Sequence, residues 1–152
     1  KHREASFRAS PADNEDIKFI FNAPGYKRYL EKKIGVSTDK FTLYGVCDML
    51  MTGPGGRAVI VDFKTGDMKA MLLKNRDKYR SQLDFYEYCV KRGVSGVQSV
   101  EKYIVFLNDG PSGVSAEIFQ TLTPRAETEL LDGCRLYSAA LEKEYLQLIA
   151  GQ

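Results

Sequence analysis

Three charged residues stand in stretches of the chain that are otherwise apolar. Asp48 interrupts residues 41–52, and Asp62 and Lys64 lie near the end of residues 57–64. Because side chains alternate along a β-strand, Asp62 and Lys64 share one face. A buried carboxylate without a partner is costly, and two on neighbouring strands repel each other unless a divalent cation lies between them. These residue types at this spacing therefore predict a divalent-metal site beside a lysine.

Each of the three residues also has a structural interpretation. Asp62 can pair with Lys64 or end its strand, and Asp48 can be exposed to solvent. Taken one residue at a time, the structural interpretation is favoured. The combination of all three on adjacent strands favours the metal site.

Hydrophobic periodicity predicts the elements that position these residues. Residues 41–52 alternate with period two and are apolar on both faces, which is typical of a largely buried strand. A Gly- and Pro-rich turn over 52–56 separates it from a strand over 57–64, so the two should form a hairpin. An apolar stripe over 74–92 predicts a helix that ends at Gly93. The first strand should carry on one face Phe41, Leu43, Gly45, Cys47, Met49 and Met51, and on the other Thr42, Tyr44, Val46, Asp48 and Leu50.

The rest of the chain completes an α/β pattern. We expect a short helix or irregular lead-in within 10–26, and strands over 29–36, 100–107 and 114–121. A last helix should follow the N-cap Thr123 and Pro124 and run to the end. The order of elements, without repeats or linkers, predicts a single domain over residues 1–152. Since the chain begins at Lys1, we expect an upstream segment or a longer parent chain.

Composition narrows the class of protein. The 152 residues are 43% hydrophobic and 28% charged, as in an average globular domain with its own core. The net charge of +2 is too small to imply a polyanionic partner by itself. Cys47, Cys89 and Cys134 fit neither a disulfide framework nor a zinc or iron–sulfur motif, and predict buried thiols in a reducing, intracellular compartment. The apolar stretches are too short to span a membrane.

Three motifs carry a resemblance to a known family. They are Gly45-Val46-Cys47-Asp48, then Asp62-Phe63-Lys64-Thr65-Gly66 after an apolar run, then Gln82-Leu83-Asp84-Phe85-Tyr86 on the expected helix. In this order they resemble the PD-(D/E)xK nuclease superfamily, and within it the RecB-like exonuclease branch with its QxxxY motif. Val61 stands where the superfamily name has proline, which removes no ligand. The resemblance implies a restriction-endonuclease-like core, a central mixed β-sheet flanked by helices.

The resemblance also implies the roles of site residues. Asp48 and Asp62, with the main-chain carbonyl of Phe63, would hold Mg²⁺ or Mn²⁺. Lys64 would orient the attacking water and stabilise the transition state. Glu31 stands about where the family places a further acid, and is either a metal ligand or a solvated charge beside two lysines.

The helical motif adds two residues to the catalytic set. Gln82 and Tyr86 are four residues apart and therefore lie on one face of the helix. An ordinary core aromatic is the alternative for Tyr86. The chain lacks the cysteine triplet of iron–sulfur relatives after the nuclease core, so no iron–sulfur cluster is expected.

A basic segment precedes the helical motif. Residues 69–80 hold five basic residues and one acid, so five minus one gives +4. A nucleic-acid strand would enter here, so we expect contacts to phosphates and a base stacked on Tyr79. A solvated helix face is the alternative. The expected nucleic-acid-binding residues are Lys74, Arg76, Lys78, Tyr79 and Arg80. A second basic cluster near Glu31 consists of Lys27, Arg28, Lys32 and Lys33.

These observations predict a Mg²⁺- or Mn²⁺-dependent deoxyribonuclease. The resemblance favours an exonuclease or end-processing enzyme on single-stranded rather than double-stranded DNA, within a recombination or replication complex. Two alternatives remain: a catalytically silent nuclease fold that binds DNA or protein, and an RNA- or junction-specific endonuclease. The silent form is disfavoured, because an inactive protein has no need to keep Asp48, Asp62 and Lys64 together.

Overall fold

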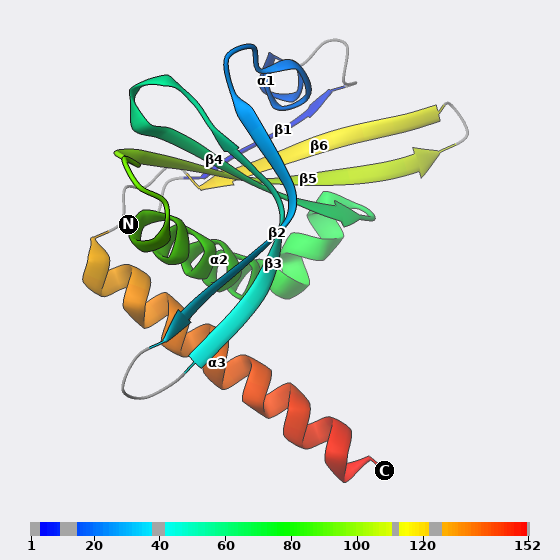
Figure 1. Cartoon of the computed structure of the whole chain (residues 1–152). Coiled ribbons are helices and arrows are strands. Elements are labelled where there is room, and N and C mark those ends of the chain that lie inside the picture. Colours follow the sequence, from blue (N-terminus) through cyan, green and yellow to red (C-terminus); the bar gives the residue numbers. More distant parts are fainter. Residues whose placement is uncertain (1–3, 10–14, 38–41, 111–112, 122–125, 152) are drawn as a thin grey trace.

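The computed structural model describes residues 4–9, 15–37, 42–110, 113–121 and 126–151. In these ranges six strands form one mixed sheet in the order β1-β6-β5-β4-β3-β2, with helices on both faces (Figure 1). β4 and β5 pair in parallel, and the other neighbours pair antiparallel. This is the α/β arrangement expected from the sequence. The strands are β1 (Glu4–Ala9), β2 (Lys27–Ser37), β3 (Thr42–Thr52), β4 (Arg57–Thr65), β5 (Ser99–Gly110) and β6 (Gly113–Thr121), and the helices are α1 (Glu15–Asn22), α2 (Met68–Gly93) and α3 (Glu127–Ala150).

Helix α2 forms the crossover between the parallel strands β4 and β5. Parallel neighbours need such a connection, because a short hairpin cannot join them. The helix begins earlier than the predicted residue 74, because the Asp67 side chain caps it by accepting a hydrogen bond from the main-chain N–H of Ala70 at 2.9 Å. α2 therefore starts close to the end of β4, just after Lys64.

Two apolar cores lie on the two faces of the sheet. Ile60 of β4 packs with residues of α2 and α3, and Val59 and Val61 pack with Ile20 of α1 on the opposite face. Successive side chains of β4 thus point alternately into the two cores. Asp62, two residues after Ile60, therefore lies on the same face as Ile60, the face covered by α2.

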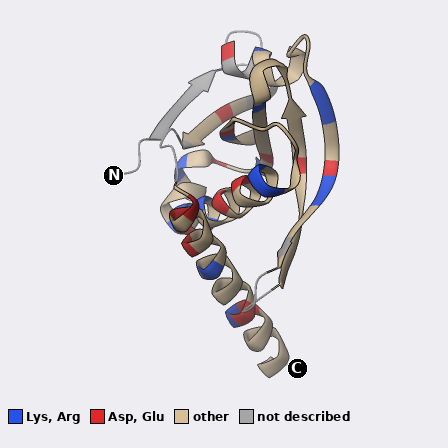
Figure 2. Ribbon diagram, turned by 60° about the vertical axis from the view of Figure 1, so that its left-hand side comes forward, with Lys and Arg blue, Asp and Glu red and all other residues tan. Residues whose placement is uncertain are grey.

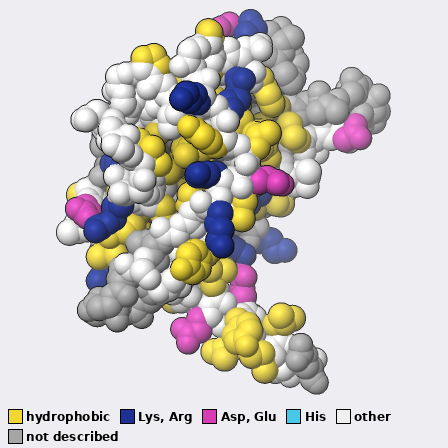
Figure 3. Space-filling view, viewed as in Figure 1, with side chains coloured by type: hydrophobic (Ala, Val, Ile, Leu, Met, Phe, Trp, Pro, Cys, Tyr) yellow, Lys and Arg dark blue, Asp and Glu magenta, His cyan; other side chains and the backbone are white. Residues whose placement is uncertain are grey.

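Most predicted elements have counterparts. The lead-in contains α1, and β2 to β6 match the expected strands within a few residues, whereas β1 was not predicted. Phe41 and the N-cap Thr123 lie outside the described residues. The described helices include none that is long and apolar enough to cross a membrane. α3 extends beyond the sheet, and apolar side chains gather on its projecting end (Figure 3).

The three cysteines are buried free thiols, as predicted. Burial raises the pKa of Cys47, Cys89 and Cys134 to about 12. They are therefore inert apolar groups at neutral pH rather than nucleophiles.

A buried ion cluster ties α2 to β5. Nζ of Lys102, a residue that is 1% exposed, lies 2.6 Å from Glu87 Oε1 and 3.2 Å from Asp84 Oδ1. α3 approaches the same place through Gly133, where a Cβ would come within 2.7 Å of the Asp84 Cβ. Lys91 reaches Glu87 from the solvent side at 2.9 Å.

Lys102→Met should lower the free energy of unfolding by about 3–5 kcal/mol, because it leaves two buried carboxylates without their shared cation. Lys91→Met is the matched control. Its side chain is partly exposed and Glu87 keeps Lys102, so a loss below about 1 kcal/mol is expected. Urea denaturation of both variants measures the difference. Equal losses would show that the cluster does not depend on Lys102.

Candidate active site

Strands β3 and β4 separate where the two acidic residues lie. Their antiparallel pairing ends at Met49 and Val61. Beyond this point β3 pairs only with β2, and β4 only with β5. Asp48 and Asp62 are the next residues on the two strands, so they flank the opening that the separation creates.

A side chain replaces the hydrogen bond that strand pairing no longer provides there. The main-chain N–H of Phe63 donates to Oδ2 of Asp48 at 2.8 Å. In a strand, the N–H and C=O of one residue point to the same edge, so the carbonyl of Phe63 also faces the opening. The hydrogen bond therefore fixes the Asp48 carboxylate beside β4 and places a main-chain oxygen near the two acids.

Asp48 also marks a shift in the alternation of β3. Cys47 packs in the core on the α2 side, and so does Leu50, whereas Met49 between them packs on the α1 side. The predicted uninterrupted alternation over 41–52 is therefore wrong. The shift results from the change of neighbours at this level, since β3 leaves β4 but stays paired with β2.

Strand β2 is irregular at the same level. The register places Glu31 directly opposite Asp48. Glu31 has a φ of +48°, in the left-handed region that residues other than glycine rarely adopt, and its side chain is exposed. Among the described residues, no group of three or more His, Cys, Asp or Glu side chains could hold a metal ion. The structure thus brings Asp48 and Asp62 together without Glu31.

Asp62 is the buried carboxylate of the pair. Its side chain is 4% exposed, and its Oδ2 lies 2.8 Å from Nζ of Lys64. That contact lacks hydrogen-bond geometry, so Oδ2 has no hydrogen-bond partner in the described part of the chain. Burial raises the pKa of Asp62 from 3.8 to about 6; Lys64 opposes the rise and Asp48 adds to it. The single positive charge of Lys64 therefore does not offset the burial of Asp62 and the nearby charge of Asp48.

Gln82 and Tyr86 link this site to α2. Gln82 Nε2 donates to the Tyr86 hydroxyl at 3.0 Å, and that hydroxyl donates to the carbonyl of Val46 at 3.1 Å. Lys64 Nζ lies 3.5 Å from Gln82 Oε1, which is long for a hydrogen bond. Tyr86 thus holds β3 against α2, and its effect on Lys64 passes through Gln82.

The glycine of the first motif has a packing role. A Cβ at Gly45 would lie 3.0 Å from the ring of Phe85 and 3.4 Å from that of Tyr86. Such contacts are tight, so a side chain here would push β3 away from α2. Close approach of the two elements is what lets Tyr86 reach Val46.

One tyrosine at the site was not singled out by the sequence. Tyr137 of α3 lines the same groove as Gln82 and Lys64, and it packs on Phe85 with a distance of 5.4 Å between the ring centroids. Its place in the apolar stripe of the last helix predicted only a core residue. The sequence alone has no signal that separates the two roles.

A groove of about 390 Å³ lies beside Lys64 between α2 and α3. Tyr79 lines it, but this side chain is 6% exposed and its ring lies 5.2 Å from the Lys64 ammonium and 6.2 Å from the Phe106 ring. Base stacking on Tyr79 stays a prediction, and in this structure the tyrosine is buried rather than open to solvent. Its aromatic face instead contacts the Lys64 ammonium in a cation–π arrangement.

The basic residues of α2 do not form one surface. Lys78 faces α3, where it lies 2.6 Å from Glu144. Arg76 lies instead over the ring of Phe119 of β6, at 5.8 Å, and Arg80 shares its side of the helix. Lys74 is exposed. The four cations thus lie on two sides of α2, and Lys78 has a carboxylate partner, while phosphate binding by these residues stays a prediction.

The donors at the opening fit a hard divalent cation. Two carboxylates and a main-chain carbonyl are oxygen ligands, and Mg²⁺ is commonly held by one or two carboxylates plus waters and substrate phosphates. The buried Asp62 Oδ2 without a hydrogen-bond partner is the clearest sign of this fit. A cation there would also relieve the repulsion between Asp48 and Asp62.

Comparison with known proteins agrees with this chemistry. A family model described as the PD-(D/E)XK nuclease superfamily matches residues 1–150. Among solved structures, the chain is similar to one titled "Crystal structure of SSO0001", with a TM-score of 0.45 and 12% sequence identity. That similarity covers 82% of this chain and 56% of the solved chain, so this chain spans little more than half of that protein. No curated protein matches.

Asp62→Asn should stabilise the metal-free protein at neutral pH. Because the folded state raises the pKa of Asp62 from 3.8 to about 6, this group lowers stability as pH rises through that interval. The variant should be more stable than the wild type above pH 6, by on the order of 2 kcal/mol, and equal to it below pH 4. Urea unfolding in EDTA across this range measures the difference.

The exposed ion-paired Asp132 provides the control, since Asp132→Asn should leave the profile unchanged. A wild type that is more stable than Asp62→Asn at neutral pH would mean that the Lys64 pair outweighs the cost of burial. In that case the structural interpretation of Asp62 would be correct.

Proposed function

Because the chain belongs to the PD-(D/E)XK nuclease superfamily, we propose that it is a Mg²⁺- or Mn²⁺-dependent deoxyribonuclease. It hydrolyses phosphodiester bonds of single-stranded DNA, at or near an end. The observation that carries this proposal is the pair Asp48 and Asp62 at the separation of β3 and β4, with Lys64 2.8 Å from Asp62. The preference for single strands and ends rests on the resemblance of the three motifs to the RecB-like branch.

Asp48, Asp62 and the carbonyl of Phe63 hold the metal ion in this proposal. When bound, the ion lowers the pKa of a coordinated water and neutralises charge that develops on the phosphate oxygens. Hydrogen bonding to Phe63 N–H occupies one side of the Asp48 carboxylate, so its other oxygen remains for the ion. The buried Oδ2 of Asp62, which has an ion pair with Lys64 but no hydrogen bond among the described residues, would gain the ion as a second partner.

Lys64 acts on the reacting phosphate. Its ammonium lies between Asp62, Gln82 and the ring of Tyr79, so its position is limited although its side chain is partly exposed. From there it orients the attacking water and donates to a phosphate oxygen as negative charge increases. A P–O bond forms to the water oxygen, the bond to the 3′ oxygen breaks, and the products are a 5′-phosphate and a 3′-hydroxyl.

Gln82, Tyr86 and Tyr137 are positioning residues. Gln82 contacts Lys64, donates a hydrogen bond to Tyr86, and lies in the same groove as Tyr137. The Tyr86 hydroxyl also anchors the main chain two residues before Asp48. Loss of these contacts would loosen the lysine and one carboxylate together.

Lys64→Ala and Asp62→Ala should each reduce cleavage at least a hundredfold, on the order of 3 kcal/mol of transition-state stabilisation, and leave DNA binding largely intact. Labelled single- and double-stranded DNA and RNA, incubated with Mg²⁺, measure the rates and the substrate class. Lys33→Ala and Asp132→Ala are exposed controls of matched type. A Lys64→Ala variant that keeps more than about a tenth of the rate would remove Lys64 from the mechanism.

The metal dependence is tested with the wild type. Mg²⁺ or Mn²⁺ should support cleavage and raise the melting temperature, since a ligand of the native state alone stabilises it. Ca²⁺, with more ligands and longer bonds, should bind without supporting cleavage. Efficient cleavage in EDTA would exclude the metal mechanism. Binding without cleavage under every condition would identify the silent form of the fold.

A further inference from the structure

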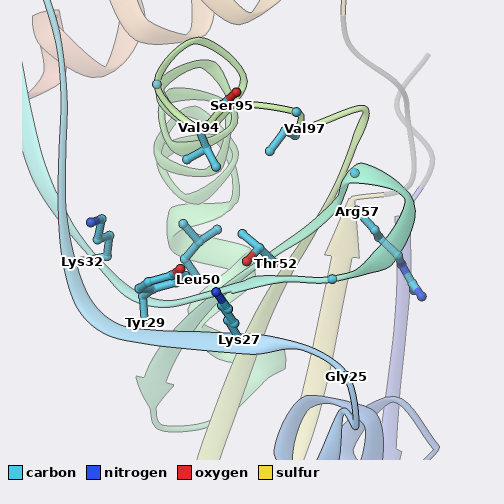
Figure 4. A pocket seen from close by; sticks show the side chains of 14 residues that line it. Gly25, Lys27, Tyr29, Lys32, Leu50, Thr52, Arg57, Val94, Ser95 and Val97 are labelled. Atoms are coloured by element: carbon cyan, nitrogen blue, oxygen red, sulfur yellow. The ribbon is translucent and has the colours of Figure 1, made fainter.

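A second pocket, of about 700 Å³, is formed by residues other than those of the candidate active site (Figure 4). It is lined by β2, by the β3–β4 hairpin, and by the loop that follows α2. One end is Lys32, which pairs with Cys47 immediately before Asp48, and the other end is Lys27, which pairs with Thr52. The pocket therefore extends along β2 from the level of Cys47, which directly precedes Asp48, to the level of Thr52.

The charge of this pocket is positive. Its lining includes Lys27, Lys32 and Arg57 and, among the described residues, no carboxylate. Arg57 is already neutralised, because its Nε donates to Glu101 at 2.8 Å. Within the described ranges, neither lysine forms an ion pair with a carboxylate; Lys32 lies over the Tyr29 ring at 5.5 Å. Two lysine charges are thus available to a ligand.

The second basic cluster predicted from the sequence lies along this strand. Figure 2 shows two basic stretches on β2, separated by one acidic residue, on the outer strand of the sheet. Of these residues, Lys27 and Lys32 line the pocket. Lys33 does not, and lies over the ring of Tyr44 at 5.4 Å. Arg28 donates to the carbonyl of Ile20.

The two walls of the pocket differ in chemistry. The β2 wall carries the lysines and Tyr29, which is 40% exposed. The opposite wall carries Val94 and Val97, with Ser95 between them, and lies at the carboxyl end of α2, where the helix dipole disfavours an anion. An anionic group is thus favoured on the β2 side, while Tyr29 and the two valines provide apolar surface on the two walls.

We propose that this pocket binds the nucleotides of the substrate strand that flank the scissile phosphate, with phosphates on Lys27 and Lys32 and a base against Tyr29. Its volume lies within the range of about 300–1,000 Å³ for ligand sites. The two lysines are at most about 17 Å apart along β2, so one strand can contact both through different phosphates. This inference rests on the proposed function, because it identifies how the same site takes its substrate.

Fluorescence anisotropy with a labelled thymidine oligonucleotide tests the assignment. The protein carries Lys64→Ala and the buffer contains Ca²⁺, so binding is measured without cleavage. Lys27→Gln/Lys32→Gln should raise Kd on the order of tenfold at 0.15 M salt and lower the slope of log Kd against log salt by about 1.4, two phosphate contacts at about 0.7 each. Lys33→Gln/Lys143→Gln removes the same charge from exposed sites outside the pocket and should change Kd less than about twofold.

Equal effects of the two double variants, or no effect of either, would overturn the proposal, provided that melting curves show both variants folded. Tight binding of free thymidine monophosphate that depends on Lys27 and Lys32 would instead make the pocket a mononucleotide site and would also overturn it. Failure of the proposed function is a separate result: a wild type that does not cleave can still bind the oligonucleotide through Lys27 and Lys32, and a wild type that cleaves can fail this binding test.

Discussion

The hydrogen bond from the Phe63 N–H to Asp48 stands where β3 and β4 part, and the candidate site depends on it. Had the strands stayed paired, main-chain groups would occupy the space in which the carboxylates meet. Because they separate, β4 presents Phe63 to a side chain instead of a strand, and Asp48 satisfies it at 2.8 Å. The same separation exposes an edge of β4 that carries Asp62 and Lys64 on the α2 side. The residues of the candidate site thus lie where sheet pairing ends locally, on strands rather than on a loop.

The sequence was sufficient to locate this site, but it did not predict the way in which the residues are held. Asp48, Asp62 and Lys64 stood out because a charge in an apolar strand requires a partner, and the motif order placed them on adjacent elements. Strict alternation of β3 failed at Asp48, since alternation assumes the same neighbours along the whole strand. The contact between Lys64 and Tyr79 was not predicted, because helical spacing distinguishes the faces of a helix but does not show which face a lysine from a strand will cover. Tyr137 was missed because a buried tyrosine in a stripe has the same pattern whether or not its hydroxyl serves a site.

Helix α2 combines the structural and the functional demands of the fold. Its inner face carries apolar residues, the acids that hold Lys102, and the Gln82–Tyr86 pair. These groups lie within two turns of the helix. The ion cluster that ties α2 to β5 therefore also positions the part of α2 that carries Gln82 near Lys64. A buried ion cluster is weak grounds for stability in itself, because an apolar replacement of the whole cluster can be as stable. Here it has a geometric consequence, since β5, α2 and α3 meet at Asp84 and Gly133.

The main-chain amide of Phe63 can report on the candidate site, because it donates its hydrogen bond to Asp48. Its proton lies along a short contact to an oxygen of Asp48, and the chemical shift of an amide proton responds to the charge of the acceptor. A single resonance in a heteronuclear NMR spectrum would therefore report on the electrostatic state of the site, without a label and without substrate. Hydrogen exchange at the same amide would report how often β3 moves away from β4. One backbone position thus records both the occupancy of the site and the opening of the strands that form it.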